Sequence, residues 1–402
     1  MDLTLSRTIG LLTVAIIVAI VSRRLRLPYT VGLVVTGLSL ALAPPVANIN
    51  LTYDFIFDVI LPPLLFEAAL SIHWAELRRD ALPVLTLATL GVVISAAVVA
   101  AGMTYGVGWP LEPAVLFGVL IAATDPVSVI AMFKDTGIKG RLRLVVESES
   151  LLNDGVAAVL FVIALGWAQA LSHGSLSVAD IARQLAVTSG GGLLVGLACG
   201  GLAIAVAGRT SDRLVETALT AVVAYGSFQT AERLHCSGVL ATVAAGMLMG
   251  NLGILGERDI FLLRGREFVL AFWEFAAFIA NSFVFLLIGL TVGHMPLDGL
   301  APLSLVAAIG FVLLGRALTV YPLSLIFRGS RWAIPLRDQH IVWWGGLRGA
   351  LALALALALP PDLPGRHDIL AAAFATVAFA VIVQGLTVPP MLRVLGFYPK
   401  RS

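Results

Sequence analysis

The sequence predicts an all-α polytopic membrane protein with a single transmembrane domain over residues 1–402. Composition is the first reason: 59% of the 402 residues are hydrophobic and 12% are charged, whereas a typical soluble domain has about 25% charged residues. The mean hydropathy is +0.98. Patterning is the second reason, because apolar runs long enough to span a bilayer recur along the whole chain. We therefore expect no soluble regulatory domain and no need for nucleic-acid binding.

Thirteen apolar segments are expected to form the membrane helices. They lie near residues 5–22, 28–43, 52–72, 82–106, 112–133, 144–171, 179–207, 213–232, 237–250, 268–292, 300–327, 338–359 and 369–392. The first segment ends in the basic run RRLR and has no small-residue cleavage site, so we interpret it as a retained helix rather than a signal peptide.

Loop charges orient these segments. With the N-terminus outside, the predicted inner side holds 20 Lys and Arg residues, whereas the outer side holds only Arg7, Arg183, Arg233 and Arg366. Cytoplasmic loops of membrane proteins are rich in Lys and Arg. The split therefore predicts a multi-pass protein of the cell (plasma or inner) membrane with a cytoplasmic C-terminus.

Thirteen helices also permit two inverted six-helix repeats, over about residues 3–171 and 212–396. An offset of seven helices inverts one repeat relative to the other, which is common in secondary transporters. Helix 5 would then correspond to helix 12. This interpretation rests on topology, since no repeat is visible at the level of residues.

Several ionisable residues fall inside the predicted helices, where each is costly and needs a reason. Asp125, Asp154 and Arg348 are expected near mid-depth. Glu149, Glu67 and Arg316 are expected nearer the cytoplasmic side. Structural ion pairs are the simple explanation for such charges, but two carboxylates at one level with no second cation beside them favour a functional site.

Helices 5 and 12 are predicted to be interrupted. Pro126 follows Asp125 in AATDPVSV and has no N–H, so a carbonyl near residue 122 loses its helical partner. Glycines surround Arg348 in WWGGLRGALAL and weaken that helix. Interrupted helices at corresponding positions indicate a transport site. The residues leave two roles open for Arg348, which would neutralise the carbonyl ends of the broken helices or pair with Glu149.

Oxygen atoms dominate the expected site. Ser150 and Asp154 are four residues apart and share a helix face, and with Asp125 and the Thr124 carbonyl they form an all-oxygen set, which suits hard cations. Glu67, after Pro62–Pro63, is expected to be a third carboxylate of the site, a control on its charge, or the partner of a cytoplasmic arginine. No histidine lies at mid-depth, and Cys199 and Cys236 have no metal-ligand spacing, so a transition-metal site and a resident cofactor are not expected.

Five motifs in order resemble the monovalent cation/proton antiporters, specifically the sodium/proton exchanger group. They are LPPLLFEAAL, ATDPVSV, ESLLNDGVAAVLF, FWEFAAFIANSFVFLLIGL and GGLRGALALALAL. The resemblance implies a fold of thirteen helices with inverted repeats and crossed, broken helices 5 and 12. It also implies a homodimer and a transporter, not an enzyme.

The resemblance implies a role for each motif residue. Asp125 and Asp154 would bind the cation or the proton, with Thr124, Ser150 and Glu67 as further Na+ ligands. Asn153 and Pro126 would support the site. Glu149 and Arg348 would form a structural ion pair.

The expected function is exchange of Na+ or Li+ for H+, serving pH homeostasis. A proton and a cation would compete for the shared aspartates, and the site would face each side of the membrane in turn. Asn153 in place of a second helix-6 aspartate marks the electroneutral branch, so one cation per proton is expected. The alternatives are a K+-preferring antiporter of the same fold and, from other classes, a cation channel or an intramembrane aspartyl protease; the protease motifs YD and GxGD are absent around Asp125 and Asp154.

Overall fold

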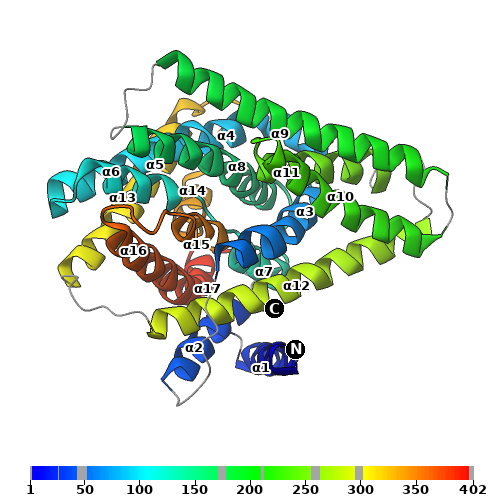
Figure 1. The fold of residues 1–402 in the computed structure, drawn as a ribbon, viewed down its shortest axis with the longest axis horizontal. Coiled ribbons are helices and arrows are strands. Elements are labelled where there is room, and N and C mark those ends of the chain that lie inside the picture. The colour runs from blue at the N-terminus through cyan, green and yellow to red at the C-terminus, as the bar shows by residue number, and fades with distance from the viewer. Residues whose placement is uncertain are drawn as a thin grey trace.

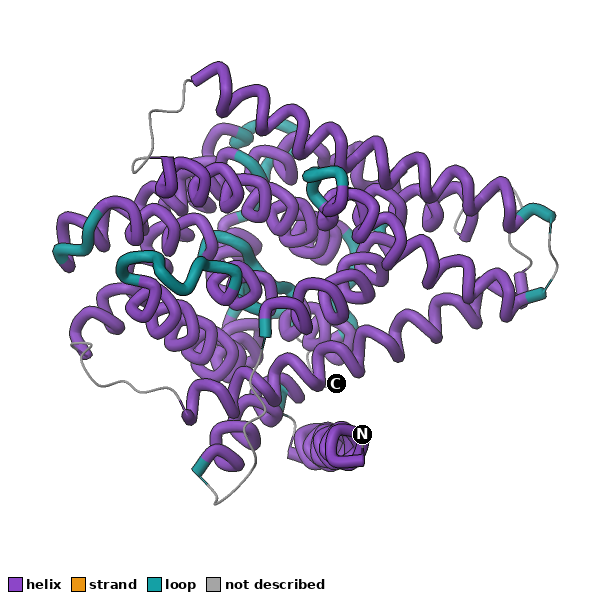
Figure 2. The backbone as a smooth tube through the Cα atoms, in the orientation of Figure 1, coloured by secondary structure: helices purple, strands orange, loops and turns teal. Residues whose placement is uncertain are grey.

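The computed structural model describes residues 2–25, 27–42, 52–170, 178–209, 212–254, 263–294 and 302–397. Helices account for most of these residues (Figure 2), which confirms the predicted all-α class. Arg26, Arg258, Lys400 and Arg401, which contribute to the predicted charge asymmetry, lie outside the described residues.

The helices follow the predicted order. The first part of the chain forms α1 (Asp2–Leu25), α2 (Tyr29–Ala41), α3 (Leu61–Ser71), α4 (Trp74–Ala88), α5 (Leu90–Ala101), α6 (Leu111–Leu120), α7 (Val127–Thr136) and α8 (Arg141–Ala170). The second part forms α9 (Val178–Ala207), α10 (Arg213–Arg233), α11 (Gly238–Leu248), α12 (Leu263–His294), α13 (Pro302–Ile326), α14 (Leu336–Trp344), α15 (Ala350–Leu357), α16 (Arg366–Phe379) and α17 (Gly385–Val394). The π-helical turns η1 (Phe55–Ile60), η2 (Gly102–Val107), η3 (Met249–Ile254) and η4 (Ala380–Gln384) adjoin α3, α5, α11 and α16.

Each predicted segment overlaps at least one helix of the described residues. Within that part of the chain, six helical stretches are long and apolar enough to cross a membrane, and they are Trp74–Val107, Arg141–Gln169, Ala179–Ala207, Arg266–His294, Pro302–Ile326 and Arg366–Val394. The protein is therefore a multi-pass membrane protein. The number of crossings and the inverted repeats remain predictions.

The fourth segment begins earlier than its hydropathy indicates. We expected it near residue 82, whereas α4 begins at Trp74. The additional turns contain Glu76, Arg78 and Arg79, which are exposed. Asp80 has non-helical backbone angles (φ −113°, ψ 16°), so these turns meet the apolar part of α4 at a kink. Hydropathy follows the apolar part of a helix and therefore misses such a polar extension.

Two segments are interrupted, as predicted. The fifth consists of α6 and α7 with residues 121–126 between them, and the twelfth consists of α14 and α15 with residues 345–349 between them. In Figure 1, α7, α8, α14 and α15 lie in the interior, while α9 and α12 run along two sides of the molecule. The interruptions thus lie in the packed centre, where irregular backbone is tolerated in a membrane protein.

Helices α2 and α12 form a closely packed pair. A Cβ added to Gly37 on α2 would collide with the Leu286 carbonyl on α12, and a Cβ added to Gly289 on α12 would collide with the Val34 carbonyl on α2. Small residues allow membrane helices to approach at backbone distance. This pair borders the functional site described next.

Candidate functional site

The two interrupted segments meet at one point. The Asp125 N–H donates to the Leu347 carbonyl at 2.7 Å, and the two residues form an isolated antiparallel bridge. Pro126 accounts for the first break, because it lacks an N–H and disfavours helical geometry in the residue before it. The predicted crossing of the fifth and twelfth segments therefore consists of two short extended stretches, which this backbone hydrogen bond joins.

Arg348 neutralises the carbonyl end of α6. Its Nη1 donates to the carbonyls of Ala122 at 2.8 Å and Ala123 at 3.0 Å, and the residue is 2% exposed. The last carbonyls of a helix have no partner within it and carry partial negative charge. The sequence left two roles open for Arg348, and in the structure it neutralises the carbonyl end of a broken helix.

The expected Glu149–Arg348 ion pair is wrong. Glu149 pairs with Arg316 of α13, whose Nη1 donates to Oε1 at 2.7 Å and whose Nη2 donates to Oε2 at 2.9 Å. The physical reason is depth: Arg348 is held at the crossing by the carbonyls of Ala122 and Ala123, while Arg316 approaches at the level of Glu149. Arg316 is the one supporting residue that the resemblance did not supply.

Asn153 connects this ion pair to the crossing. Its Nδ2 donates to Glu149 Oε1 at 3.0 Å and to Thr124 Oγ1 at 2.6 Å, and its Oδ1 accepts from the Thr124 N–H at 3.2 Å. Ser150 Oγ lies 2.9 Å from Thr124 Oγ1. Thr124, Ser150, Asn153 and Glu149 are all buried. The predicted supporting residue Asn153 thus holds the Thr124 peptide in place.

The backbone holds Asp125 from two half-helices. Its Oδ1 accepts from the Val127 N–H of α7 at 2.9 Å, and the Ala350 N–H at the start of α15 also stabilises the charge of this carboxylate. A Cβ added to Gly349 would overlap this carboxylate. Helix N-termini attract negative charge, so α7 and α15 position Asp125 and leave part of its carboxylate facing a cavity.

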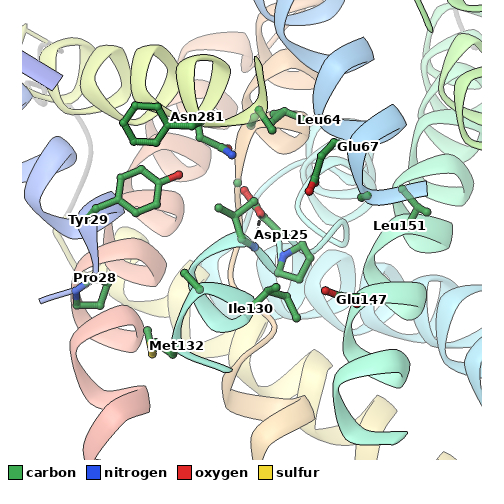
Figure 3. Close-up of a pocket in the computed structure, with 18 of the residues that line it drawn as sticks. Pro28, Tyr29, Leu64, Glu67, Asp125, Ile130, Met132, Glu147, Leu151 and Asn281 are labelled. Atoms are coloured by element: carbon green, nitrogen blue, oxygen red, sulfur yellow. Dashed lines mark hydrogen bonds between the residues drawn. The ribbon is translucent and has the colours of Figure 1, made fainter. Parts of the chain in front are cut away.

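That cavity has a volume of about 1510 Å³ and contains most of the predicted ligands. Asp125, Asp154, Thr124 and Glu67 line it, whereas Ser150 does not. Figure 3 shows the Glu67 carboxylate pointing toward Asp125 from α3. Three of the predicted carboxylates therefore share one cavity, with Ser150 behind Thr124.

The carboxylates do not form a closed metal cage. Among the described residues, no three His, Cys, Asp or Glu side chains are grouped as metal ligands. Asp125 and Asp154 nevertheless line the same cavity. The arrangement suits a cation held by one or two carboxylates together with hydroxyl, carbonyl and water oxygens, which are the ligands of hard cations.

The cavity extends to charged residues at the ends of several helices. Arg23 of α1, Arg143 and Glu147 of α8, and Arg393 of α17 also line it. Arg143 and Glu147 form an ion pair at 2.9 Å. These arginines belong to the side that the sequence predicts as cytoplasmic.

Two further polar residues of the cavity were not predicted. Tyr29 of α2 and Asn281 of α12 line it, and Figure 3 shows both side chains directed toward its interior. Asn281 belongs to FWEFAAFIANSFVFLLIGL, where an amide inside an apolar helix was the available signal. Tyr29 gave no such signal, because a tyrosine near the end of a membrane helix is ordinary.

Comparison with known proteins identifies the family to which the chain belongs. The family model described as "Sodium/hydrogen exchanger, transmembrane" matches residues 11–394. A Na+/H+ antiporter of Aphanothece halophytica is 40% identical over 94% of this chain and 71% of that protein, and one of Halobacillus aidingensis is 35% identical over 96% of each. The sodium/proton antiporter structure of Methanocaldococcus jannaschii matches 100% of both chains with a TM-score of 0.78 at 19% identity, which shows a common fold. The chain belongs to the sodium/hydrogen exchanger family.

Proposed function

We propose that this protein is a secondary antiporter that exchanges Na+ or Li+ for H+. The observation that carries the proposal is the pair of carboxylates, Asp125 and Asp154, that face one cavity at the crossing of two broken helices. A buried carboxylate is costly while charged, and either a proton or a cation neutralises it. Because both ligands use the same oxygens, binding of one excludes the other, and exchange follows from that competition.

Alternating access completes the mechanism. The loaded site is neutral enough to change the side it faces, whereas the empty site carries uncompensated charge that is costly to move. The cavity lining includes Arg23, Arg143 and Arg393, which the positive-inside rule assigns to the cytoplasm. We assign this cavity to the inward-facing state, with the N-terminus outside and the C-terminus in the cytoplasm.

The assignment of individual residues follows their positions. Asp125 and Asp154 bind the cation or the proton, Thr124 contributes oxygen, and Glu67 adds a third negative charge within the cavity. Ser150 acts through the Thr124 hydroxyl. No resident cofactor is needed, because protons and monovalent cations are the substrates.

Asn153 supports an exchange of one cation per proton. Its amide is neutral, and it is occupied by bonds to Glu149 and Thr124. Asp154 is therefore the carboxylate of the Asn-Asp pair that is available to titrate. A single titratable carboxylate in this pair, together with the homodimeric state that the resemblance implies, supports an electroneutral dimeric exchanger in the cell membrane. Its role would be pH homeostasis.

A K+-preferring antiporter is the second candidate, because a cavity of this size also admits a larger cation. The two candidates share residues and mechanism and differ only in the cation. A channel would show Na+ flux without coupled proton movement, so one assay separates all three.

The test uses purified protein in proteoliposomes with an acidic lumen and a pH-sensitive dye. Addition of Na+ or Li+ is expected to release luminal protons, whereas Asp154→Asn is expected to reduce the signal to that of empty liposomes while the variant elutes as folded protein. Lowering the pH is expected to raise the apparent Km for Na+ by up to about tenfold per unit, because protons compete for the carboxylates. Full activity of Asp154→Asn would overturn the site, and a membrane potential generated by exchange would overturn the one-to-one ratio.

A further inference from the structure

One wall of the cavity carries two neutral polar groups that the exchange mechanism above does not use. Tyr29 is the first residue of α2 and directly follows Pro28. Asn281 lies in the middle of α12 and is 6% exposed. Both side chains point into the cavity that Asp125 occupies from the other side (Figure 3).

Among the described residues, no hydrogen bond joins the Tyr29 hydroxyl or the Asn281 carboxamide to another group of the chain, and both residues line the cavity. The Tyr29 ring is held against Phe278 with the ring centroids 5.9 Å apart. Asn281 is buried and Tyr29 is half-buried. Buried polar groups nearly always have a partner, so these two groups are directed at whatever occupies the cavity.

The helices that carry these groups differ from those that carry the carboxylates. Tyr29 and Asn281 belong to the α2–α12 pair, whose backbones touch at Gly37 and Gly289. Asp125 is held by α7 and α15. The cavity is therefore bounded by two separate packed units. The unit with α7 and α15 holds the Asp125 carboxylate, whereas the α2–α12 pair supplies the neutral groups of Tyr29 and Asn281, with Glu274 seven residues before Asn281 on α12.

We propose that Tyr29 and Asn281 contribute neutral oxygen ligands to the cation and determine which monovalent cation is exchanged. The proposal rests on the antiport function proposed above. Selectivity among cations depends on cavity size and on the number and field strength of neutral oxygens. A proton binds to a carboxylate and needs no neutral ligands, so Tyr29 and Asn281 act on the cation and leave proton binding to Asp125 and Asp154.

The test compares Asn281→Ala and Tyr29→Phe with Tyr225→Phe in proteoliposomes. Tyr225 is a matched control because its hydroxyl donates to the Val59 carbonyl at 3.1 Å, away from the cavity. The apparent Km is measured for Na+, Li+ and K+, and the dependence of rate on pH is measured at saturating Na+. Thermal unfolding of each purified variant reports folding, and Asn281→Leu, which keeps a similar side-chain volume without the oxygen, replaces Asn281→Ala if the latter does not fold.

Loss of either oxygen is expected to raise the Km for Na+ by about tenfold. This factor corresponds to the free energy of one hydrogen bond to a charged group. The ratio of the Km values for K+ and Na+ should fall by a similar factor, because the enlarged site favours the larger cation. The pH dependence at saturating Na+ should stay that of the wild type. Tyr225→Phe should match the wild type in every measurement.

Unchanged cation ratios in both folded variants would overturn the proposal. So would equal shifts in the Km for Na+ and in the pH dependence, because these would place Tyr29 and Asn281 in proton binding as well. Failure of the wild-type protein to couple cations to protons would instead refute the antiport function, which the first measurement on wild-type vesicles distinguishes.

Discussion

Glu149 and Asp154 lie on the same helix, α8, yet their carboxylates have opposite surroundings. Glu149 is 1% exposed, and its oxygens accept two hydrogen bonds from Arg316 and one from Asn153. Asp154 lines the cavity instead, together with Asp125. One acid belongs to a closed network on the packed side of the crossing, and the other belongs to an open surface.

The difference teaches how a membrane protein keeps several acids in one region without losing its fold. A buried charge is tolerated only when its partner has excellent geometry and its remaining lone pairs are satisfied. The structure provides that geometry for Glu149, and it holds Asp125 with backbone N–H groups, which leave the cavity side of the carboxylate open. The fixed pair supports the crossing, while the open carboxylates remain available for an exchangeable ligand.

Removing the partner of Glu149 tests the closed side and is expected to have the largest effect. Arg316→Ala should lower the free energy of unfolding by about 3–5 kcal/mol, because the Glu149 charge stays buried without its cation. Arg143→Ala is the control, because it removes the partner of another α8 acid, Glu147. The Arg143 and Glu147 side chains are 28% and 19% exposed, and such pairs contribute at most about 1 kcal/mol. Denaturation of the purified protein in detergent measures both losses.

The double variant Arg316→Met with Glu149→Leu sharpens this comparison. It removes both charges, so it should recover most of the stability lost in Arg316→Ala. Equal losses for Arg316→Ala and Arg143→Ala would contradict the distinction between the buried pair and the exposed pair.

The open side depends on close backbone approach, which Gly349→Ala tests. The added Cβ would overlap the Asp125 carboxylate. We expect exchange to fall to background while the free energy of unfolding decreases by about 1–3 kcal/mol, the usual cost of overpacking. Gly310→Ala is the control, because a Cβ there meets no atom within 4 Å. Retention of exchange in Gly349→Ala would show that the position of the Asp125 carboxylate tolerates displacement.

Much of this architecture is predictable from the sequence, because it depends on local properties. Apolar runs predict the helical segments, and Pro126 and the glycines around Arg348 predict the two interruptions. The acids Asp125 and Asp154 stand out because charge inside an apolar helix is costly. These features need no knowledge of how the helices rotate against one another.

The remaining features depend on helix rotation and depth, which composition does not encode. The sequence placed Glu149 and Arg316 near the same depth, and that criterion alone would have identified the pair. The resemblance pointed to Arg348 instead, whose guanidinium binds carbonyls at the crossing. Tyr29 and Asn281 meet in the cavity only because α2 packs on α12, a tertiary contact that neither residue reveals.

Ser150 lies at the boundary between the two sides, and its substitution is expected to have the smallest effect. The sequence predicts it as a cation ligand, whereas its hydroxyl is buried behind the cavity and lies 2.9 Å from Thr124 Oγ1. Ser150→Ala should cost about 1 kcal/mol of stability, the net value of one hydrogen bond. Because it leaves both aspartates in place, exchange should fall less than tenfold, by about the factor that 1 kcal/mol represents. Cation-driven proton release from proteoliposomes measures this loss beside that of Asp154→Asn. A loss of exchange as complete as that of Asp154→Asn would make Ser150 a direct cation ligand, so the open side of the site would extend behind Thr124.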